Sequence, residues 1–250
     1  MKKILDFFYN TGKYFIFLTK IVARPEKAKP YYKQIIREFD KIGLDSLGLV
    51  FIVSIFMGAV ITLQAGLNFT NPLLPKSFVG YGARDSIILE FSSTMVSLIM
   101  AGKIGANIAS ELGTMRITQQ IDALEIMGIN SAGFLVLPKL LSALLFFPIF
   151  GIISMFVGIV GGWFIAYFTD VVTITEFEVG LRLFFEPFYI TYSLIKITVF
   201  GFLISSISAY QGYYVEGGSV EVGKASTKAV VYSSIAILLF NVILTHLLLA

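Results

Sequence analysis

Five long apolar segments separated by polar stretches dominate the chain. They cover residues 44–67, 86–108, 134–168, 188–210 and 227–250. A helix rises about 1.5 Å per residue, so about 20 residues cross a hydrocarbon core of roughly 30 Å, and each segment is long enough. The third segment is too long for one plain span, and Pro138 and Pro148 within it predict a lead-in segment followed by a long or kinked span. In that span Gly158 and Gly162 form a small-xxx-small pair, which favours close helix packing.

The N-terminal stretch has a different pattern. Residues 1–22 contain two short apolar runs interrupted by Asn10, Thr11 and Lys13. Neither run is long enough to span, and no small-residue cleavage site follows, so we expect an amphipathic helix lying in the membrane interface. Pro25 and Pro30 should break it, and residues 31–41 suit a short basic helix. The pattern therefore predicts two parts, an interfacial segment (1–43) and a five-span domain (44–250).

The segments between the spans are rich in polar residues. We expect loops at 68–84 and 211–226, and a loop with a short surface helix at 169–187. Between spans two and three, residues 111–127 fit one amphipathic helix that Ser110 caps and Gly128 ends. Spacings of three and four residues place one narrow polar stripe on this helix, formed by Glu111, Thr114, Thr118, Asp122 and Glu125.

Composition and charge agree with a membrane protein. Of the 250 residues, 56% are hydrophobic and 14% are charged, which is too apolar for an ordinary soluble domain. Ten of the 19 Lys and Arg residues precede residue 42, so the net charge of +3 marks orientation rather than a nucleic-acid surface. With the N-terminus in the cytoplasm, fifteen cations lie inside and three outside, which predicts that orientation. With no Cys and one His, the sequence argues against a metal site.

A few polar residues fall inside the spans. Glu90, Thr94 and Ser97 share one stripe of span two, Lys196 lies in span four, and Asn241 lies in span five. A charge at mid-helix costs roughly 3 kcal/mol on insertion scales, so it needs a reason. A salt bridge between Glu90 and Lys196 would serve either helix packing or a transport path. Asn241 suits interhelical hydrogen bonding.

Catalytic chemistry is not visible in the sequence. Residues 218–224 have the G-x-x-x-x-G-K spacing of a phosphate-binding loop, but Ala225 replaces the Ser or Thr that binds Mg²⁺, and the segment follows a membrane span rather than a strand. No nucleophile with a base and no pair of acids lies at one membrane depth. We therefore expect no enzyme activity on this chain.

One long motif resembles a known family. Residues 101–130, AGKIGANIASELGTMRITQQIDALEIMGIN, resemble the signature of the MlaE/YrbE permeases, the membrane subunits of Mce-type lipid ABC transporters. The likeness continues through Leu137-Pro138-Lys139, KITVFG (196–201), Gly212-Tyr213 and VGKASTKAVVYSS (222–234). Where that family places Arg before Glu90 and Pro three residues after it, this chain has Leu89 and Ser93.

The resemblance implies a permease subunit that moves phospholipids between a bacterial inner membrane and the outer envelope. The implied partners are a second copy of the chain, a cytoplasmic ABC ATPase carrying ATP and Mg²⁺, an Mce-domain periplasmic protein and, in some systems, a STAS-domain protein. Residues 111–127 would be the coupling helix, which meets the ATPase through Glu111, Thr114, Arg116, Thr118, Asp122 and Glu125. The alternative is a helix that only packs within the chain. Glu90, Thr94, Ser97, Lys196 and Asn241 would lie along the lipid path. A membrane scaffold, or a permease for a sterol or fatty acid, is the alternative function.

Overall fold

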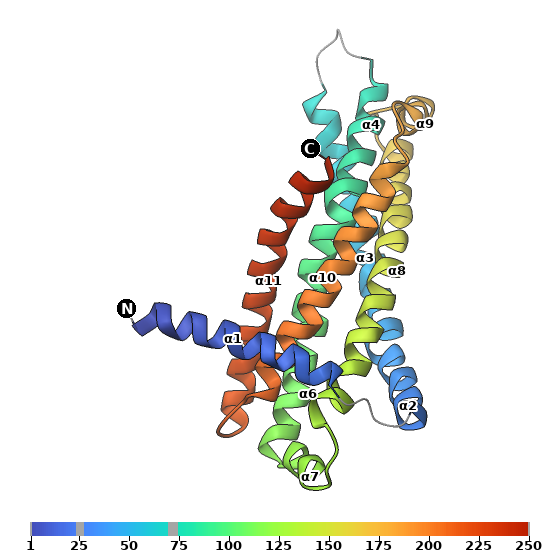
Figure 1. Ribbon diagram of the computed structural model, residues 1–250. Coiled ribbons are helices and arrows are strands. Elements are labelled where there is room, and N and C mark those ends of the chain that lie inside the picture. Colours follow the sequence, from blue (N-terminus) through green and yellow to red (C-terminus); the bar gives the residue numbers. More distant parts are fainter. Residues whose placement is uncertain (1, 24–27, 70–74, 250) are drawn as a thin grey trace. The chain divides into compact units, whose positions relative to one another are not determined.

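The computed structural model describes the backbone of residues 2–23, 28–69 and 75–249, and the side chains of 8–23, 32–69 and 75–249. Every regular element in these ranges is helical (Figure 1). Five helical stretches are long and apolar enough to cross a membrane: Tyr32–Asn68, Ser77–Ile117, Ser131–Phe168, Phe188–Tyr213 and Ser219–Leu249. The prediction of an all-α membrane protein with five spans is confirmed. The predicted break at Pro25 lies outside the described residues.

The chain folds into two compact units, each built from three stretches of sequence. Unit 1 comprises residues 1–44, 98–146 and 200–240, and unit 2 comprises 45–97, 147–199 and 241–250. In chain order the elements are α1 (Lys2–Val22), α2 (Ala28–Glu38), η1 (Phe39–Leu44), α3 (Asp45–Asn68), α4 (Ser77–Ser86), η2 (Ile87–Met95), α5 (Val96–Met100), η3 (Ala101–Gly105), α6 (Ala106–Ile117), α7 (Gln120–Ile126), α8 (Ser131–Phe168), α9 (Ile174–Arg182), α10 (Phe188–Tyr213) and α11 (Ser219–Leu249).

In unit 2, α3 and α8 pack backbone to backbone. A Cβ atom at Gly58 would overlap the carbonyl group of Gly158, and one at Gly161 would overlap that of Ile55. Ser54 Oγ donates a hydrogen bond of 2.9 Å to Ser154 Oγ across the same contact. A Cβ at Gly162, the second member of the predicted pair, would overlap Thr62 Oγ1 of α3, so close packing at Gly158 and Gly162 is confirmed. The predicted lead-in segment is wrong, since α8 is one continuous helix of 38 residues.

Also in unit 2, α4 packs against α9, and this contact corrects the predicted loop at 68–84. Residues 77–84 are helical, because their glycines permit helix contact instead of forming turns. A Cβ at Gly80 would overlap the backbone of Phe177, and one at Gly180 would overlap that of Ser77. Figure 1 shows the two helices side by side. The short helix expected within 169–187 is confirmed as α9, and a capping box between Thr173 and Glu176 starts it.

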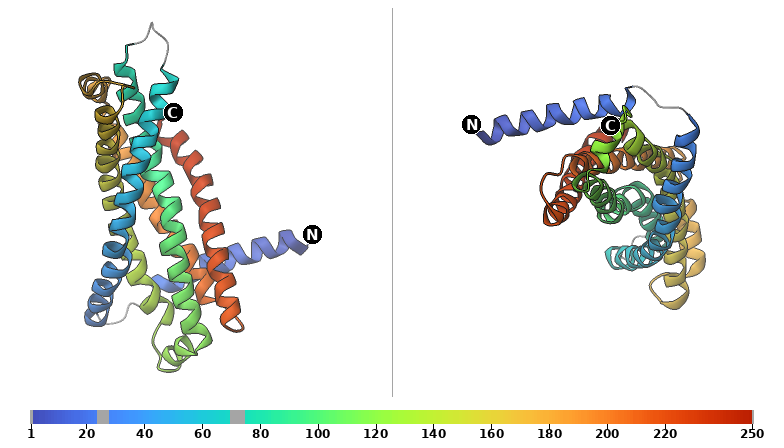
Figure 2. Two further views of the ribbon diagram at one scale, coloured as in Figure 1. Left: turned by 180° about the vertical axis from the view of Figure 1, so that it is seen from behind. Right: turned by 90° about the horizontal axis from the view of Figure 1, so that it is seen from below.

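In unit 1, α1 lies across the neighbouring parts of α10 and α11 rather than along them (Figures 1 and 2). Phe17 is fully buried on this contact, and its ring centroid lies 5.1 Å from that of Tyr213. Tyr14 and Ser206 share a hydrogen bond of 2.8 Å. The predicted N-terminal helix is confirmed as a helix, and its position in the membrane interface stays a prediction.

Two further predicted boundaries need correction in unit 1. The basic helix expected at 31–41 continues without a break through η1, so it is the beginning of the first long helical stretch. Most of the loop expected at 211–226 is helical, and only residues 214–218 separate α10 from α11. Gly212 packs directly on the backbone of Ala109, whereas Gly217, with φ +114°, makes the turn. A glycine in the sequence therefore does not show by itself whether it packs against another helix or makes a turn.

Candidate functional site

The segment between the second and third long helices forms one end of unit 1 (Figure 1). It differs from the single helix predicted over 111–127. The second long helix continues through α6 to Ile117, Gln119 adopts a left-handed conformation with φ +59°, and α7 follows as a separate helix. Ser110 lies inside α6 and caps nothing, while Gly128 ends the segment at φ +79° as predicted. A left-handed residue cannot continue a right-handed helix, so the polar stripe is divided at this turn.

The three acids of the predicted stripe all have partners within unit 1. Glu111 pairs with two lysines, described below. Asp122 accepts a hydrogen bond of 2.6 Å from Arg116 Nη1, and this ion pair bridges the turn between α6 and α7. Glu125 accepts from the hydroxyl groups of Tyr213 (2.8 Å) and Ser131 (2.9 Å). The acids therefore hold this end of unit 1 together.

Glu111 belongs to a network of four alternating charges. Lys139 Nζ lies 2.8 Å from Glu38 Oε1 and 2.8 Å from Glu111 Oε2, and Lys41 Nζ lies 2.9 Å from Glu111 Oε1. The Lys139 and Glu38 side chains are 3% and 5% exposed, so this pair is fully desolvated. The network joins α2 and η1 to α6 and α8. Sequence reasoning did not find it, because Lys139 and Glu38 resemble flanking charges when each is taken alone.

Glu125 has an environment that favours its charged form. Hydrogen bonds from Tyr213, and then from Ser131, hold the pKa of this carboxyl below its usual value, while partial desolvation opposes them. Nearby, Asn130 Nδ2 donates to the carbonyl groups of Lys20 (2.8 Å) and Ala23, at the end of α1. The end of α7 and the loop after it are thus fixed to α1, α8 and α10 by side-chain hydrogen bonds.

Glu125 is exposed, and the Asp122 side chain is 45% exposed, but much of the other exposed surface of this segment is neutral. Thr114, Thr118, Gln119 and Gln120 are exposed, and both threonine hydroxyls bond back to carbonyl groups of α6. Ile126 is 88% exposed and Met127 is 65% exposed at the end of α7. They are the most exposed large apolar side chains of the segment.

In unit 2, the predicted intramembrane polar residues form one cluster. Lys196 Nζ lies 2.9 Å from Glu90 Oε1, so the salt bridge that the sequence left open is present. The other carboxylate oxygen of Glu90 accepts hydrogen bonds from Thr94 Oγ1 (3.0 Å) and Asn241 Nδ2 (3.2 Å). The Lys196 side chain is fully buried, whereas that of Glu90 is 49% exposed. The cluster therefore exposes part of the Glu90 carboxylate, which is paired with the buried Lys196.

Two features of this cluster extend beyond the sequence analysis. Lys196 also donates to Tyr192 Oη (2.8 Å), which shares a hydrogen bond of 2.8 Å with Thr245 Oγ1. Glu90 and Thr94 lie in η2, a π-helical segment in which each turn holds extra backbone, a feature frequent at functional sites. Ser97 is buried outside the cluster, and its hydroxyl has no hydrogen-bond partner among the described residues. The predicted stripe on span two is thus divided, because Glu90 and Thr94 belong to the cluster and Ser97 does not.

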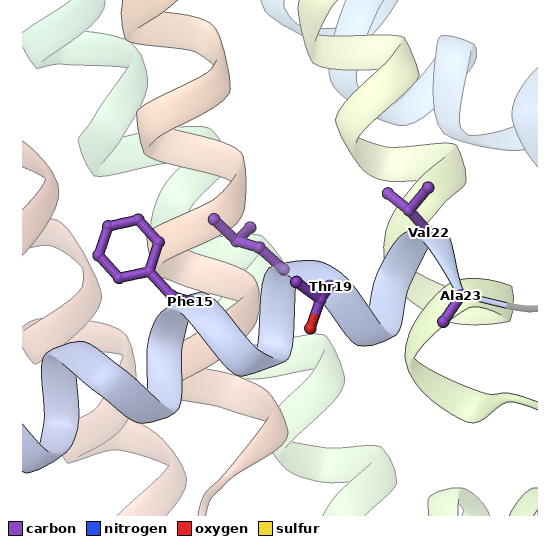
Figure 3. Close-up of a pocket in the computed structure, with 5 residues that line it drawn as sticks. Phe15, Thr19, Val22 and Ala23 are labelled. Carbon is purple, nitrogen blue, oxygen red and sulfur yellow. The ribbon is translucent and has the colours of Figure 1, made fainter.

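A shallow apolar hollow of about 570 Å³ lies along α1 in unit 1 (Figure 3). It is lined by Phe15, Leu18, Thr19, Val22 and Ala23. The Thr19 hydroxyl donates back to the carbonyl group of Ile16 at 2.7 Å, so it contributes no free polar group. An exposed apolar surface of this kind suits a helix lying in a membrane interface.

Comparisons with known proteins assign the chain to a family. The family Permease MlaE matches residues 35–247. A probable ABC transporter permease protein of Rickettsia bellii is 34% identical over 98% of this chain and 95% of its own length. A similar protein of Rickettsia prowazekii is 35% identical over the same shares. The chloroplastic protein TRIGALACTOSYLDIACYLGLYCEROL 1 of Arabidopsis thaliana is 29% identical over 90% of this chain and 64% of its own length. The chain therefore belongs to the MlaE permease family and is similar to ABC transporter permease subunits.

Proposed function

We propose that this chain is the membrane permease of an ABC transporter that moves phospholipids between the inner membrane and the outer envelope of a bacterium. The observation that carries the proposal is the Glu90–Lys196 cluster inside helices that are long enough to span. Ionisable residues are costly in a membrane and mark substrate pathways. The Arabidopsis relative is named after a glycolipid, which supports a lipid cargo.

The cluster suggests how the chain would contact a lipid. Lys196 is buried and fixed by Glu90, Tyr192 and Thr245, so its charge is already compensated. The open side of the Glu90 carboxylate is the group left to meet a headgroup, and the π-helical backbone of η2 aims it. In this proposal Thr94 and Asn241 orient the carboxylate through its second oxygen.

ATP hydrolysis belongs to a separate cytoplasmic subunit in this proposal, with ATP and Mg²⁺ bound there. The α6–α7 segment would receive that ATPase. Its acids Glu111, Asp122 and Glu125 would act by shaping the segment, because each has a partner within the chain. Direct contact would come from the exposed neutral surface, which includes Thr114, Thr118, Ile126 and Met127.

The remaining partners follow from the same proposal. The apolar side chains of α11 are mostly exposed, among them Leu239, Val242 and Leu247, which suits contact with lipid and with a second copy of the chain. An Mce-domain protein would receive the lipid in the periplasm, and a STAS-domain protein would join the complex in some systems. The N-terminus and the α6–α7 segment would face the cytoplasm.

Mass spectrometry of everything that co-purifies with the chain from its native membrane in mild detergent tests this assignment. We expect an ABC ATPase, an Mce-domain protein and bound phospholipid. Recovery of the chain alone, with no ATPase after cross-linking, would remove the energy source and favour a scaffold.

A further inference from the structure

Tyr213 lies where four helices of unit 1 meet. It is the last residue of α10 and is 6% exposed. Its hydroxyl donates to Glu125 of α7 at 2.8 Å and lies 2.7 Å from Ser131 Oγ, at the start of α8. Its ring packs against Phe17 of α1, with centroids 5.1 Å apart. A buried tyrosine needs a partner for its hydroxyl, and here that partner is the end of α7.

A second contact fixes the same region to α1. The Asn130 side chain donates to the Lys20 carbonyl group at 2.8 Å and also contacts that of Ala23. Its Oδ1 accepts from the backbone amide of Gly133 at 3.3 Å. The Lys20 carbonyl group belongs to the last turn of α1, where carbonyl groups have no partner within the helix. The chain that leaves α7 therefore completes the end of α1.

Apart from the fully buried Ile121, the short helix α7 is held mainly by side-chain contacts at its two ends. It contains seven residues, begins after the left-handed Gln119 and ends before Gly128. Arg116 holds its beginning through Asp122, and Tyr213 and Ser131 hold its end through Glu125. A helix this short is unstable alone, so its position depends on these side chains.

We propose that Tyr213 and Asn130 are positioning residues that join α7 to α1, so that movement of α7 is transmitted to the N-terminal helix. This inference rests on the proposed function, in which α7 receives the ATPase. Displacement of α7 would pull on Glu125 and Asn130 together, and both lead to α1, one through the Tyr213–Phe17 contact and one directly. ATP hydrolysis would thereby move a helix that we expect to lie in the membrane interface.

The link itself is tested by hydrogen exchange on the full chain, without the ATPase. We expect Tyr213→Phe, which keeps the ring and removes only the hydroxyl, to speed amide exchange in α7 and in the last turn of α1 together. Asn130→Ala should do the same and changes no residue of a long helix, so it decides the question if Tyr213→Phe fails to fold. Tyr214→Phe is the matched control, because it removes the neighbouring hydroxyl and leaves the Glu125 contacts in place. Unchanged exchange in α1 in both variants would overturn the link.

The role of the link is tested in the reconstituted complex with the ATPase. We expect Tyr213→Phe and Asn130→Ala to retain ATPase association and to lower the phospholipid transferred per ATP hydrolysed roughly fivefold, as for one hydrogen bond of average strength. Tyr214→Phe should match the unmodified chain. Equal transfer per ATP in all variants would refute the coupling role. An unmodified complex that moves no lipid, with the exchange link intact, would instead refute the proposed function and, with it, this role.

Discussion

Replacing Lys139 by methionine is expected to cost far more stability than replacing Lys41, although both pair with Glu111. Lys139 lies 2.8 Å from Glu38, whose side chain is 5% exposed, so its removal leaves a buried carboxylate without its lysine. Breaking one partner from a buried pair costs about 3–5 kcal/mol. Lys41 is 34% exposed, and Glu111 keeps Lys139 when Lys41 is lost. An exposed pair contributes about 0–1 kcal/mol.

Equilibrium unfolding of the purified variants in one detergent measures these differences. We expect Lys139→Met to lower the free energy of unfolding by about 3–5 kcal/mol and Lys41→Met by at most about 1 kcal/mol. The double variant Glu38→Met, Lys139→Met should recover most of the loss, because an apolar pair of similar volume can replace a buried ion pair. If Lys139→Met is no less stable than Lys41→Met, the reasoning from burial is refuted.

Three other perturbations test the packing and the charges. Gly58→Ala should lower the free energy of unfolding by about 1–3 kcal/mol by forcing α3 away from α8, whereas Gly48→Ala on the same helix, with open space around it, should not. Arg84 donates hydrogen bonds to backbone carbonyl groups and thereby holds the loop after α9, where Phe184 has φ +47°. Arg84→Met should therefore speed proteolysis of that loop. The pKa of Glu125 is lowered in the folded state, so the stability that this carboxylate contributes is present above its unfolded pKa of about 4.3 and is lost as pH falls through its folded pKa. The melting temperature should therefore fall below about pH 4, and it should fall less in Glu125→Gln.

The sequence predicted the long helices, which depend on length and apolarity. Its prediction of loops failed where glycine serves helix packing instead of a turn. The five spans follow from runs of apolar residues, which only helices can carry across a membrane. Gly80 and Gly212 led us to expect loops, but both lie at backbone contacts between helices. Those contacts join residues far apart in sequence, so a local pattern does not reveal them.

The candidate site shows the same division. The pair Glu90–Lys196 was predictable because each charge alone is costly in a span. The pair Glu38–Lys139 was not predictable. A charged residue near the end of a span can be solvated by water, and only the folded structure shows that these two are buried together. The left-handed Gln119 that divides the predicted helix also had no local signal, since glutamine carries no preference for that conformation.

ATP-dependent phospholipid transfer in reconstituted vesicles tests the central claim most directly. The proposed complex of this chain with an ABC ATPase and an Mce-domain protein should move labelled phospholipid only when ATP is hydrolysed. Lys196→Met should stop the transfer while ATP hydrolysis continues, because it removes the buried charge that fixes Glu90. Transfer that proceeds without ATP, or that is unaffected by Lys196→Met, would contradict the account.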